Sequence, residues 1–251
     1  MVSEMSSELL FRACIRRPEP WPSDFLSGVF RRVRSRGLRF GDYYADQESN
    51  EDPPFVFSSR GAPSSESDFE RALEVSEKQG WGWIAYEFDL QDGDGRPEPL
   101  DFAIKPHPES RDGRWLVAEI SVRVNHVHTE DEMNPFLESI VIPTLRELKP
   151  ILAVGDVSED YPYLPSTEEL EAATPSQVCW FNLYGPSAVK AIGEDRLRGL
   201  QGFPRLRLVW LEEGGVILVL QPLPVPDPRD YVRARLNLEE RRNPHEARKP
   251  S

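Results

Sequence analysis

The sequence predicts an α+β fold in which antiparallel sheets carry helices packed on one face. Three strand-like runs at residues 81–90, 100–105 and 115–127 follow one another with no helical pattern between them, which favours an antiparallel meander. Segments with apolar residues at helical spacing precede and follow these runs. The chain has 251 residues, of which 39% are hydrophobic, and this length and composition suffice for a substantial core.

The first elements along the chain are a strand and a helix. Residues 9–15 form an apolar, strand-like run. The helix is predicted at 24–36, with Ser23 as its N-cap and Gly37 at its end. Its apolar positions recur at helical spacing and are Phe25, Leu26, Val29, Phe30 and Val33.

Two short strands and a second helix come next. The strands are predicted at 38–44 and 55–57. Ser67 and Glu70 have the spacing of a capping box, which predicts a helix that opens there and ends at Gly80.

The turn at 91–99 joins two strands of the meander. Asp92 and Asp94, each followed by glycine, resemble the start of a calcium-binding EF-hand loop. Arg96 and Ala103 stand where that loop requires oxygen ligands, so a hairpin turn is the better interpretation.

A helix is predicted after the meander. Thr129 and Glu132 form a further capping box, and apolar residues at helical spacing continue to Leu148. Pro143 lacks a backbone N–H and is expected to kink this helix.

The last third of the chain alternates shorter helices and strands. Ser166 and Glu169 form a capping box for a helix ending at Ala173. The elements expected after it are a strand at 177–184, a helix at 187–200, and a hairpin of 206–212 and 216–221. This order predicts an N-terminal α+β subdomain at 1–150, a C-terminal strand–helix–hairpin subdomain at 151–228 and a charged tail at 229–251.

Charge separates the function classes. The chain has 43 Asp and Glu against 30 Lys and Arg, a net charge of −13, which argues against a nucleic-acid partner because phosphate contacts need basic side chains. The acidic excess lies in two blocks, with net charges of −12 at 42–101 and −9 at 127–173. If these blocks meet on one face, they favour a cationic partner.

The sequence predicts no cofactor and a cytoplasmic location. Cys14 and Cys179 lie in apolar runs and are expected to be buried free thiols. His126 and His128 share one face of a predicted strand end and suit a metal with Glu130 or Asp131, although a complete site needs three or four ligands. The N-terminus does not resemble a signal peptide, and no run approaches the roughly 20 apolar residues of a membrane helix, so no membrane partner is expected.

Motifs of catalysis are missing from the sequence, so we expect a protein that is not an enzyme. No GxGxxG, GxxxxGK[ST] or GxSxG string occurs, and neither cysteine has the local signature of a nucleophile. Carboxylate pairs such as Glu119 with Asp101 leave a hydrolase open as an alternative.

A protein-binding surface is predicted from the acidic turns and the tyrosines beside them. Tyrosine supplies contact area at interfaces, and carboxylates supply steering and specificity. The segment of Asp160, Tyr161, Pro162 and Tyr163 combines both and is expected to be exposed. The predicted contact residues are Asp92, Asp94, Glu130, Asp131, Glu132, Glu159, Asp160, Tyr161 and Tyr163.

The stretch from 177 to 221 resembles the bacterial type VI-associated immunity family. A strand bearing Trp180, a short helix ending near Gly193 and a hairpin bracketed by Gly214 and Gly215 occur in the order seen in that family. The resemblance implies a cytoplasmic protein that binds and neutralises a toxin delivered by sister cells. It carries over no catalytic residues, because such proteins act by occlusion.

The leading hypothesis is therefore an immunity protein. Its acidic, aromatic-bearing surface occludes the active site of a cognate toxin, which is expected to be cationic, for instance a nuclease. The alternatives are a carboxylate-dependent hydrolase and a generic acidic adaptor protein.

Overall fold

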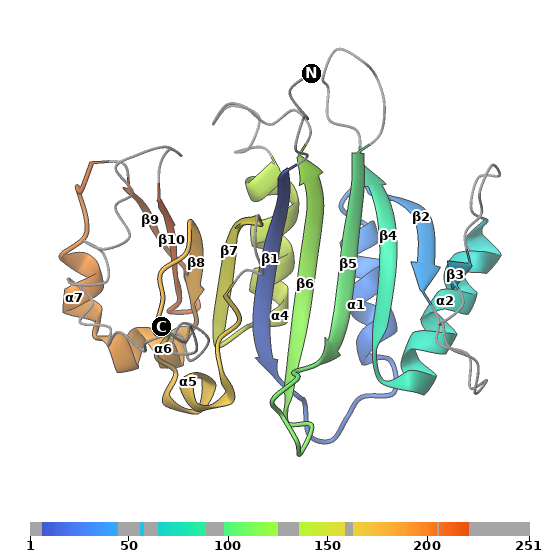
Figure 1. Cartoon of the computed structure of the whole chain (residues 1–251), viewed down its shortest axis with the longest axis horizontal. Coiled ribbons are helices and arrows are strands. Elements are labelled where there is room, and N and C mark those ends of the chain that lie inside the picture. Colours follow the sequence, from blue (N-terminus) through green and yellow to red (C-terminus); the bar gives the residue numbers. More distant parts are fainter. Residues whose placement is uncertain are drawn as a thin grey trace, which may run out of the picture.

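A computed structural model describes residues 7–44, 56–57, 65–88, 98–124, 136–158, 163–204 and 206–220. Within these ranges ten strands form one sheet, in the order β3-β2-β4-β5-β6-β1-β7-β8-β10-β9 (Figure 1). Neighbouring strands are antiparallel throughout. The strands are β1 (Ser7–Arg16), β2 (Arg39–Tyr44), β3 (Val56–Phe57), β4 (Gly82–Phe88), β5 (Glu98–Pro106), β6 (Trp115–Val124), β7 (Leu152–Ser158), β8 (Phe181–Tyr184), β9 (Leu206–Trp210) and β10 (Val216–Leu220).

The predicted meander is confirmed as β4, β5 and β6, which are neighbours in the sheet. The first strand of the chain lies at the centre of the sheet, because β1 pairs with β6 on one side and with β7 on the other. Strands on both sides of residue 150 therefore share one hydrogen-bonded layer. Whether either predicted subdomain folds separately stays a prediction.

Helices follow the predicted segments with shifted boundaries. The 187–200 helix is divided at Gly193, whose φ of +101° favours glycine. The N-cap of the first helix is Asp24 and not the predicted Ser23. The helices are α1 (Phe25–Arg34), α2 (Glu66–Gln79), the π-helix η1 (Leu137–Val141), α4 (Ile142–Leu148), α5 (Thr167–Ala172), α6 (Pro186–Ile192) and α7 (Glu194–Arg198).

The capping box of α2 begins two residues earlier than predicted. The Ser65 side chain accepts a hydrogen bond from the Asp68 backbone N–H, and the Asp68 carboxylate accepts one from the Ser65 N–H. Ser67 and Glu70 were the predicted pair. Glu70 instead pairs with Arg31 of α1, a tertiary contact that the local motif does not reveal.

Pro143 interrupts the helix predicted up to Leu148. It lies in the first turn of α4, directly after the π-helical turn η1. Because proline has no N–H to donate, the regular hydrogen-bond ladder cannot continue through it, and the widened turn absorbs the mismatch. The predicted capping box at Thr129 and Glu132 lies outside the described residues.

The core lies between the sheet and the helices α1, α2 and α4. One row across the sheet consists of Ile84, Phe102, Ile120 and Phe11, each at most 1% exposed. Phe30 of α1 packs edge-on against Phe102, with the ring centroids 5.5 Å apart. Figure 1 shows α1 and α4 behind the sheet, so these strand residues point toward the helices. We call this side the helix face and the opposite side the second face.

Helix α7, at the C-terminal end of the sheet, packs on the second face. Arg207 and Trp210 of β9 are three positions apart and therefore point to opposite faces of the strand. Arg207 forms an ion pair with Glu138 of η1, whereas the guanidinium of Arg198 in α7 lies 4.4 Å from the centroid of the Trp210 ring. The predicted α+β class is confirmed, and its helical cover extends to both faces of the sheet.

Both cysteines are buried free thiols, as predicted. Burial raises the pKa of the Cys14 thiol to about 12, so this sulfur stays protonated at neutral pH. It behaves as a small apolar side chain in the core.

Candidate functional site

The predicted partner contacts continue from strand ends that lie together. Register places Phe88 opposite Glu98, Ser7 opposite Val124 and Glu8 opposite Ser158, so β4, β5, β6, β1 and β7 each have one end at the same end of the sheet. Segments 89–97, 125–135 and 159–162 continue the chain from these ends. The contact residues on these segments lie outside the described residues and are Asp92, Asp94, Glu130, Asp131, Glu132, Glu159, Asp160 and Tyr161. The structure thus brings together the anchor points of three acidic segments that are far apart in sequence.

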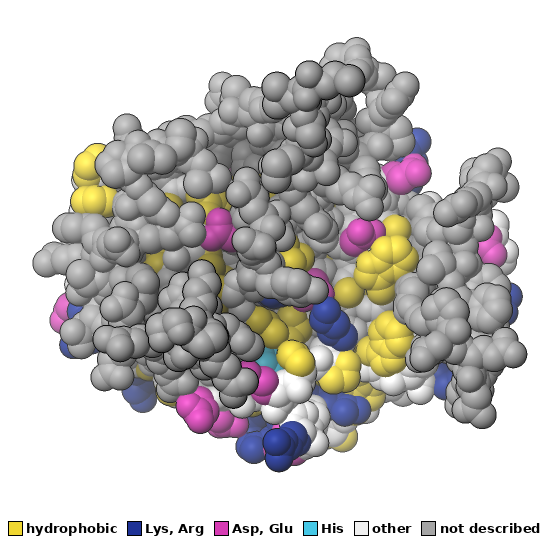
Figure 2. All heavy atoms as spheres, in the orientation of Figure 1, with side chains coloured by type: hydrophobic (Ala, Val, Ile, Leu, Met, Phe, Trp, Pro, Cys, Tyr) yellow, Lys and Arg dark blue, Asp and Glu magenta, His cyan; other side chains and the backbone are white. Residues whose placement is uncertain are grey.

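A cross-strand row near this end adds carboxylates on the second face. Register aligns Ala85, Asp101, Ser121, Leu10 and Asp156 on five neighbouring strands. Each follows or precedes a residue of the helix face, so the row points to the second face. All five are half-buried. Hydrophobic, basic and acidic side chains intermix on this side of the molecule (Figure 2).

A cluster of two cations and one carboxylate lies one row further along the second face. Glu119 forms ion pairs with Arg12, at 2.9 Å, and with Lys105, at 2.5 Å. The side chains of Arg12 and Glu119 are only 12% and 15% exposed. Glu119 is one of the two carboxylates that left a hydrolase open, and in the structure two cations compensate its charge. This arrangement holds β1, β5 and β6 together and offers no support for an acid–base role.

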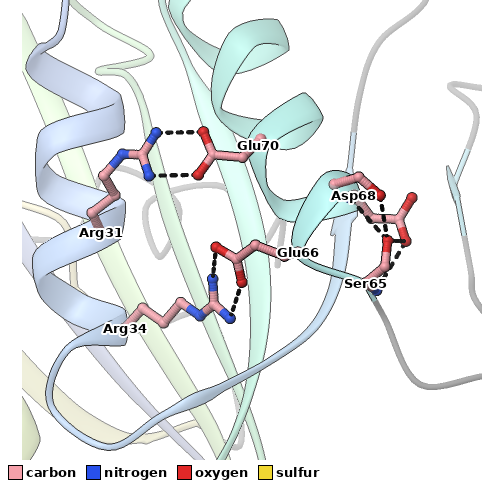
Figure 3. Close-up of polar contacts among 7 residues, drawn as sticks. Arg31, Arg34, Ser65, Glu66, Asp68 and Glu70 are labelled. Carbon is pink, nitrogen blue, oxygen red and sulfur yellow. Dashed lines mark hydrogen bonds and ion pairs between the residues drawn. The ribbon is translucent and has the colours of Figure 1, made fainter.

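Some of the acidic excess is neutralised within the chain. Arg31 and Arg34 of α1 form two-pronged ion pairs with Glu70 and Glu66 of α2, both from the acidic block at 42–101 (Figure 3). The hydrogen bond from Arg34 lowers the pKa of Glu66. Glu147, from the block at 127–173, pairs with two further arginines, Arg32 and Arg36. Glu66, Glu70 and Glu147 are therefore paired within the chain.

Tyr163 is half-buried rather than exposed as predicted. Its hydroxyl donates a hydrogen bond to Oε1 of Glu169, at 2.5 Å, and accepts one from the Ser176 N–H. Burial and the bond to Glu169 raise the pKa of Tyr163. Its hydroxyl is thus engaged within the chain, and only the ring is left for a partner. A partner-binding role of Tyr163 stays a prediction.

Glu169 is the centre of this cluster and is 5% exposed. Its Oε1 also accepts the Ser176 N–H at 2.6 Å, and its Oε2 accepts the Ser166 N–H at 2.6 Å. Burial disfavours the charged form, but these hydrogen bonds outweigh it and leave the pKa of Glu169 below its ordinary value. The predicted capping box of Ser166 and Glu169 is confirmed. Its links to Tyr163 and Ser176 could not be read from the local motif.

His107 also has a structural role that the sequence did not reveal. In the sequence it lies between Pro106 and Pro108, which indicates only a rigid loop. In the structure its ring is 2% exposed and contacts the carbonyl of Pro165, at 2.9 Å, on the segment that leads into α5. The sequence shows only a histidine between two prolines, and no nearby residue indicates that its partner is Pro165.

The structure gives two results on metals and membranes for the residues it describes. Within the described ranges, no group of three or more His, Cys, Asp and Glu side chains is arranged to hold a metal ion. The predicted pair His126 and His128 lies outside those ranges, so its metal binding is untested. Among the described helices, none has the length and apolar character needed to cross a bilayer.

Comparison with known proteins supports the fold. No protein-family model and no curated protein matches the chain. A solved structure described as Pseudomonas aeruginosa T6SS protein PA0821 is similar, with a TM-score of 0.51 and 16% sequence identity. The similarity covers 92% of this chain and 72% of that protein. This chain therefore has a fold similar to that of a protein of the bacterial type VI secretion system (T6SS).

Proposed function

We propose that this protein is an immunity protein of a type VI secretion system that binds a cognate toxin and occludes the toxin's active site. The observation that carries the proposal is the fold shared with a T6SS protein over 92% of the chain. The resemblance of 177–221 to the immunity family rests on the order of short sequence motifs, and it supports the same proposal. In this proposal the protein acts in the cytoplasm, by occlusion and without catalysis.

The acidic strand ends suggest where the toxin binds. Three acidic segments continue from one end of the sheet, beside the half-buried carboxylates Asp101 and Asp156. Converging carboxylates accelerate the approach of a cationic protein and disfavour partners of like charge. A cationic toxin such as a nuclease fits this surface, because carboxylates then take the place of substrate phosphates.

Co-expression tests the function. The protein encoded by the neighbouring open reading frame is expressed alone and together with this chain, and growth is measured. We expect toxicity alone and rescue with this chain. Absence of rescue with every neighbouring product would contradict the proposal.

Charge reversal tests the location of the interface. Five carboxylates of the acidic segments are changed to lysine, namely Asp92, Asp94, Glu130, Asp131 and Glu132. The matched control reverses five exposed carboxylates elsewhere, Asp24, Glu74, Glu194, Asp195 and Glu212. Both variants change net charge equally, so a larger fall in association rate and in its salt dependence is expected only for the first. Equal slowing of association in both variants would show that net charge, and not the position of these carboxylates, controls the rate.

A further inference from the structure

The segment from Tyr163 to Ser176, which contains α5 and is here called the α5 segment, is docked on the 107–114 connection between β5 and β6. His107 contacts the Pro165 carbonyl at 2.9 Å, and the Glu109 carboxylate accepts the Thr167 N–H at 3.2 Å. Arg114 and Glu171 form a longer ion pair at 3.4 Å. Three contacts therefore join two parts of the chain that are more than 50 residues apart.

The tautomer of His107 follows from its neighbours. The Glu109 N–H donates to Nδ1 of His107 at 3.2 Å, so Nδ1 carries no hydrogen. Nε2 must then carry it and donates to the Pro165 carbonyl. Nδ1 is thus bonded to the connection to which His107 belongs, and Nε2 is bonded to the α5 segment.

The histidine bond is the most shielded of the three contacts. Its ring is 2% exposed, whereas the Arg114 and Glu171 side chains are 50% and 55% exposed and the Glu109–Thr167 bond is also exposed. Exposed ion pairs contribute little because water and salt screen them. A buried hydrogen bond leaves an unsatisfied carbonyl when its donor is removed.

The α5 segment is braced internally as well. Glu169 joins Tyr163, Ser166 and Ser176 through its two carboxylate oxygens. A displacement of Pro165 is therefore transmitted to Tyr163, the predicted partner contact within this braced unit.

We propose that His107 is a positioning residue for toxin binding. Through the Pro165 carbonyl it fixes the place of the α5 segment, and with it the ring of Tyr163, the predicted partner contact on this segment. This inference rests on the proposed immunity function. A pre-positioned contact segment raises affinity because less conformational entropy is lost on binding.

Two substitutions at His107 separate its two hydrogen bonds. His107→Asn keeps an acceptor at the place of Nδ1 for the Glu109 N–H, but its side chain is too short to reach the Pro165 carbonyl. His107→Gln is long enough for its amide nitrogen to donate to that carbonyl. If His107 were needed only for packing within the 107–114 connection, His107→Gln would not restore the behaviour that His107→Asn loses.

The first readout is amide hydrogen exchange of the protein alone. In His107→Asn we expect exchange of the Ser166, Thr167 and Ser176 amides to rise about tenfold, as the loss of roughly one hydrogen bond implies. His107→Gln is expected to stay near the wild type, and α2 amides serve as the internal control in both. Wild-type exchange in His107→Asn would overturn the positioning role.

The second readout is binding to the toxin encoded by the neighbouring open reading frame. We expect His107→Asn to weaken affinity about tenfold, mainly through faster dissociation, and His107→Gln to restore it. Faster exchange with unchanged affinity would overturn the role in binding and leave the immunity function intact. If the wild type binds no neighbouring product, the immunity function fails and this role fails with it, whatever the exchange data show.

A further variant guards against misfolding. If His107→Asn does not fold, Pro165→Gly is used in its place, because it keeps the carbonyl that accepts the bond but loosens the backbone before α5. The same pattern of faster exchange and weaker binding is expected. Unchanged exchange in this variant would also count against the proposal.

Discussion

Replacing Glu169 with glutamine removes a buried charge at nearly constant size. The carboxylate accepts three hydrogen bonds, from the Tyr163 hydroxyl and from the backbone N–H groups of Ser166 and Ser176. Both oxygens of the carboxylate face a backbone donor. Whichever way the glutamine amide is turned, its NH₂ group faces one of these N–H groups, and that donor loses its hydrogen bond to residue 169.

The size of the effect follows from this count. One charge-assisted hydrogen bond contributes about 1.5–3 kcal/mol, and the neutral amide avoids part of the desolvation that opposes the buried charge. We therefore expect Glu169→Gln to lower the free energy of unfolding at pH 7 by about 2 kcal/mol. For a chain of this length that corresponds to a melting temperature lower by roughly 4–8 °C.

The loss should depend on pH. Because the folded-state pKa of Glu169 is lowered, its contribution is present above the unfolded-state pKa of about 4.3 and is lost as pH falls through the folded-state pKa. The gap between wild type and Glu169→Gln is thus full at pH 7. It should narrow from about pH 5 downward.

Urea unfolding followed by tryptophan fluorescence at several pH values measures this gap. Glu171→Gln is the matched control, since that carboxylate lies in the same helix but is 55% exposed and only loosely paired; its effect should be near zero. A gap between wild type and Glu169→Gln that is below about 0.5 kcal/mol, or that does not change with pH, would refute the reasoning.

Three further predictions concern packing, reactivity and surface charge. In Gly155→Ala the new methyl group would overlap the Phe11 ring, so the free energy of unfolding should fall by about 1–3 kcal/mol; an unchanged denaturation midpoint would show that the core relaxes around it. Cys14 should not react with a thiol reagent at pH 8 until the protein unfolds, and prompt labelling would contradict its burial. In Arg34→Ala the lost pair with Glu66 should lower the melting temperature slightly at low salt and less at high salt; an equal loss at both would point to packing of the arginine on its neighbours instead.

Local patterns predicted most of the secondary structure. The β4, β5 and β6 meander shows as consecutive strand-like runs, and the Ser166 and Glu169 capping box was found from its spacing alone. The interruption at Pro143 follows from the missing N–H of proline. These features depend on residues only a few positions apart, so one stretch of sequence contains the information.

The candidate site depended on contacts that span the chain. The bond from His107 to Pro165 joins residues 58 positions apart, and the pairs of Arg31 and Arg34 with α2 span 39 and 32 positions. No local pattern indicates which distant partner a side chain will meet. The charge count was correct, but it could not show which carboxylates are neutralised inside the molecule.

By itself the sequence determined the α+β class, the order of the elements, the buried thiols and the acidic excess, because periodicity, capping and composition act locally or over the whole chain. Only the tertiary structure decided that β1 lies between β6 and β7, and that five strand ends, four of which lead to acidic segments, share one end of the sheet. The physical reason is strand pairing. Antiparallel register between distant segments sets which ends coincide, and the chain must close long loops to achieve it.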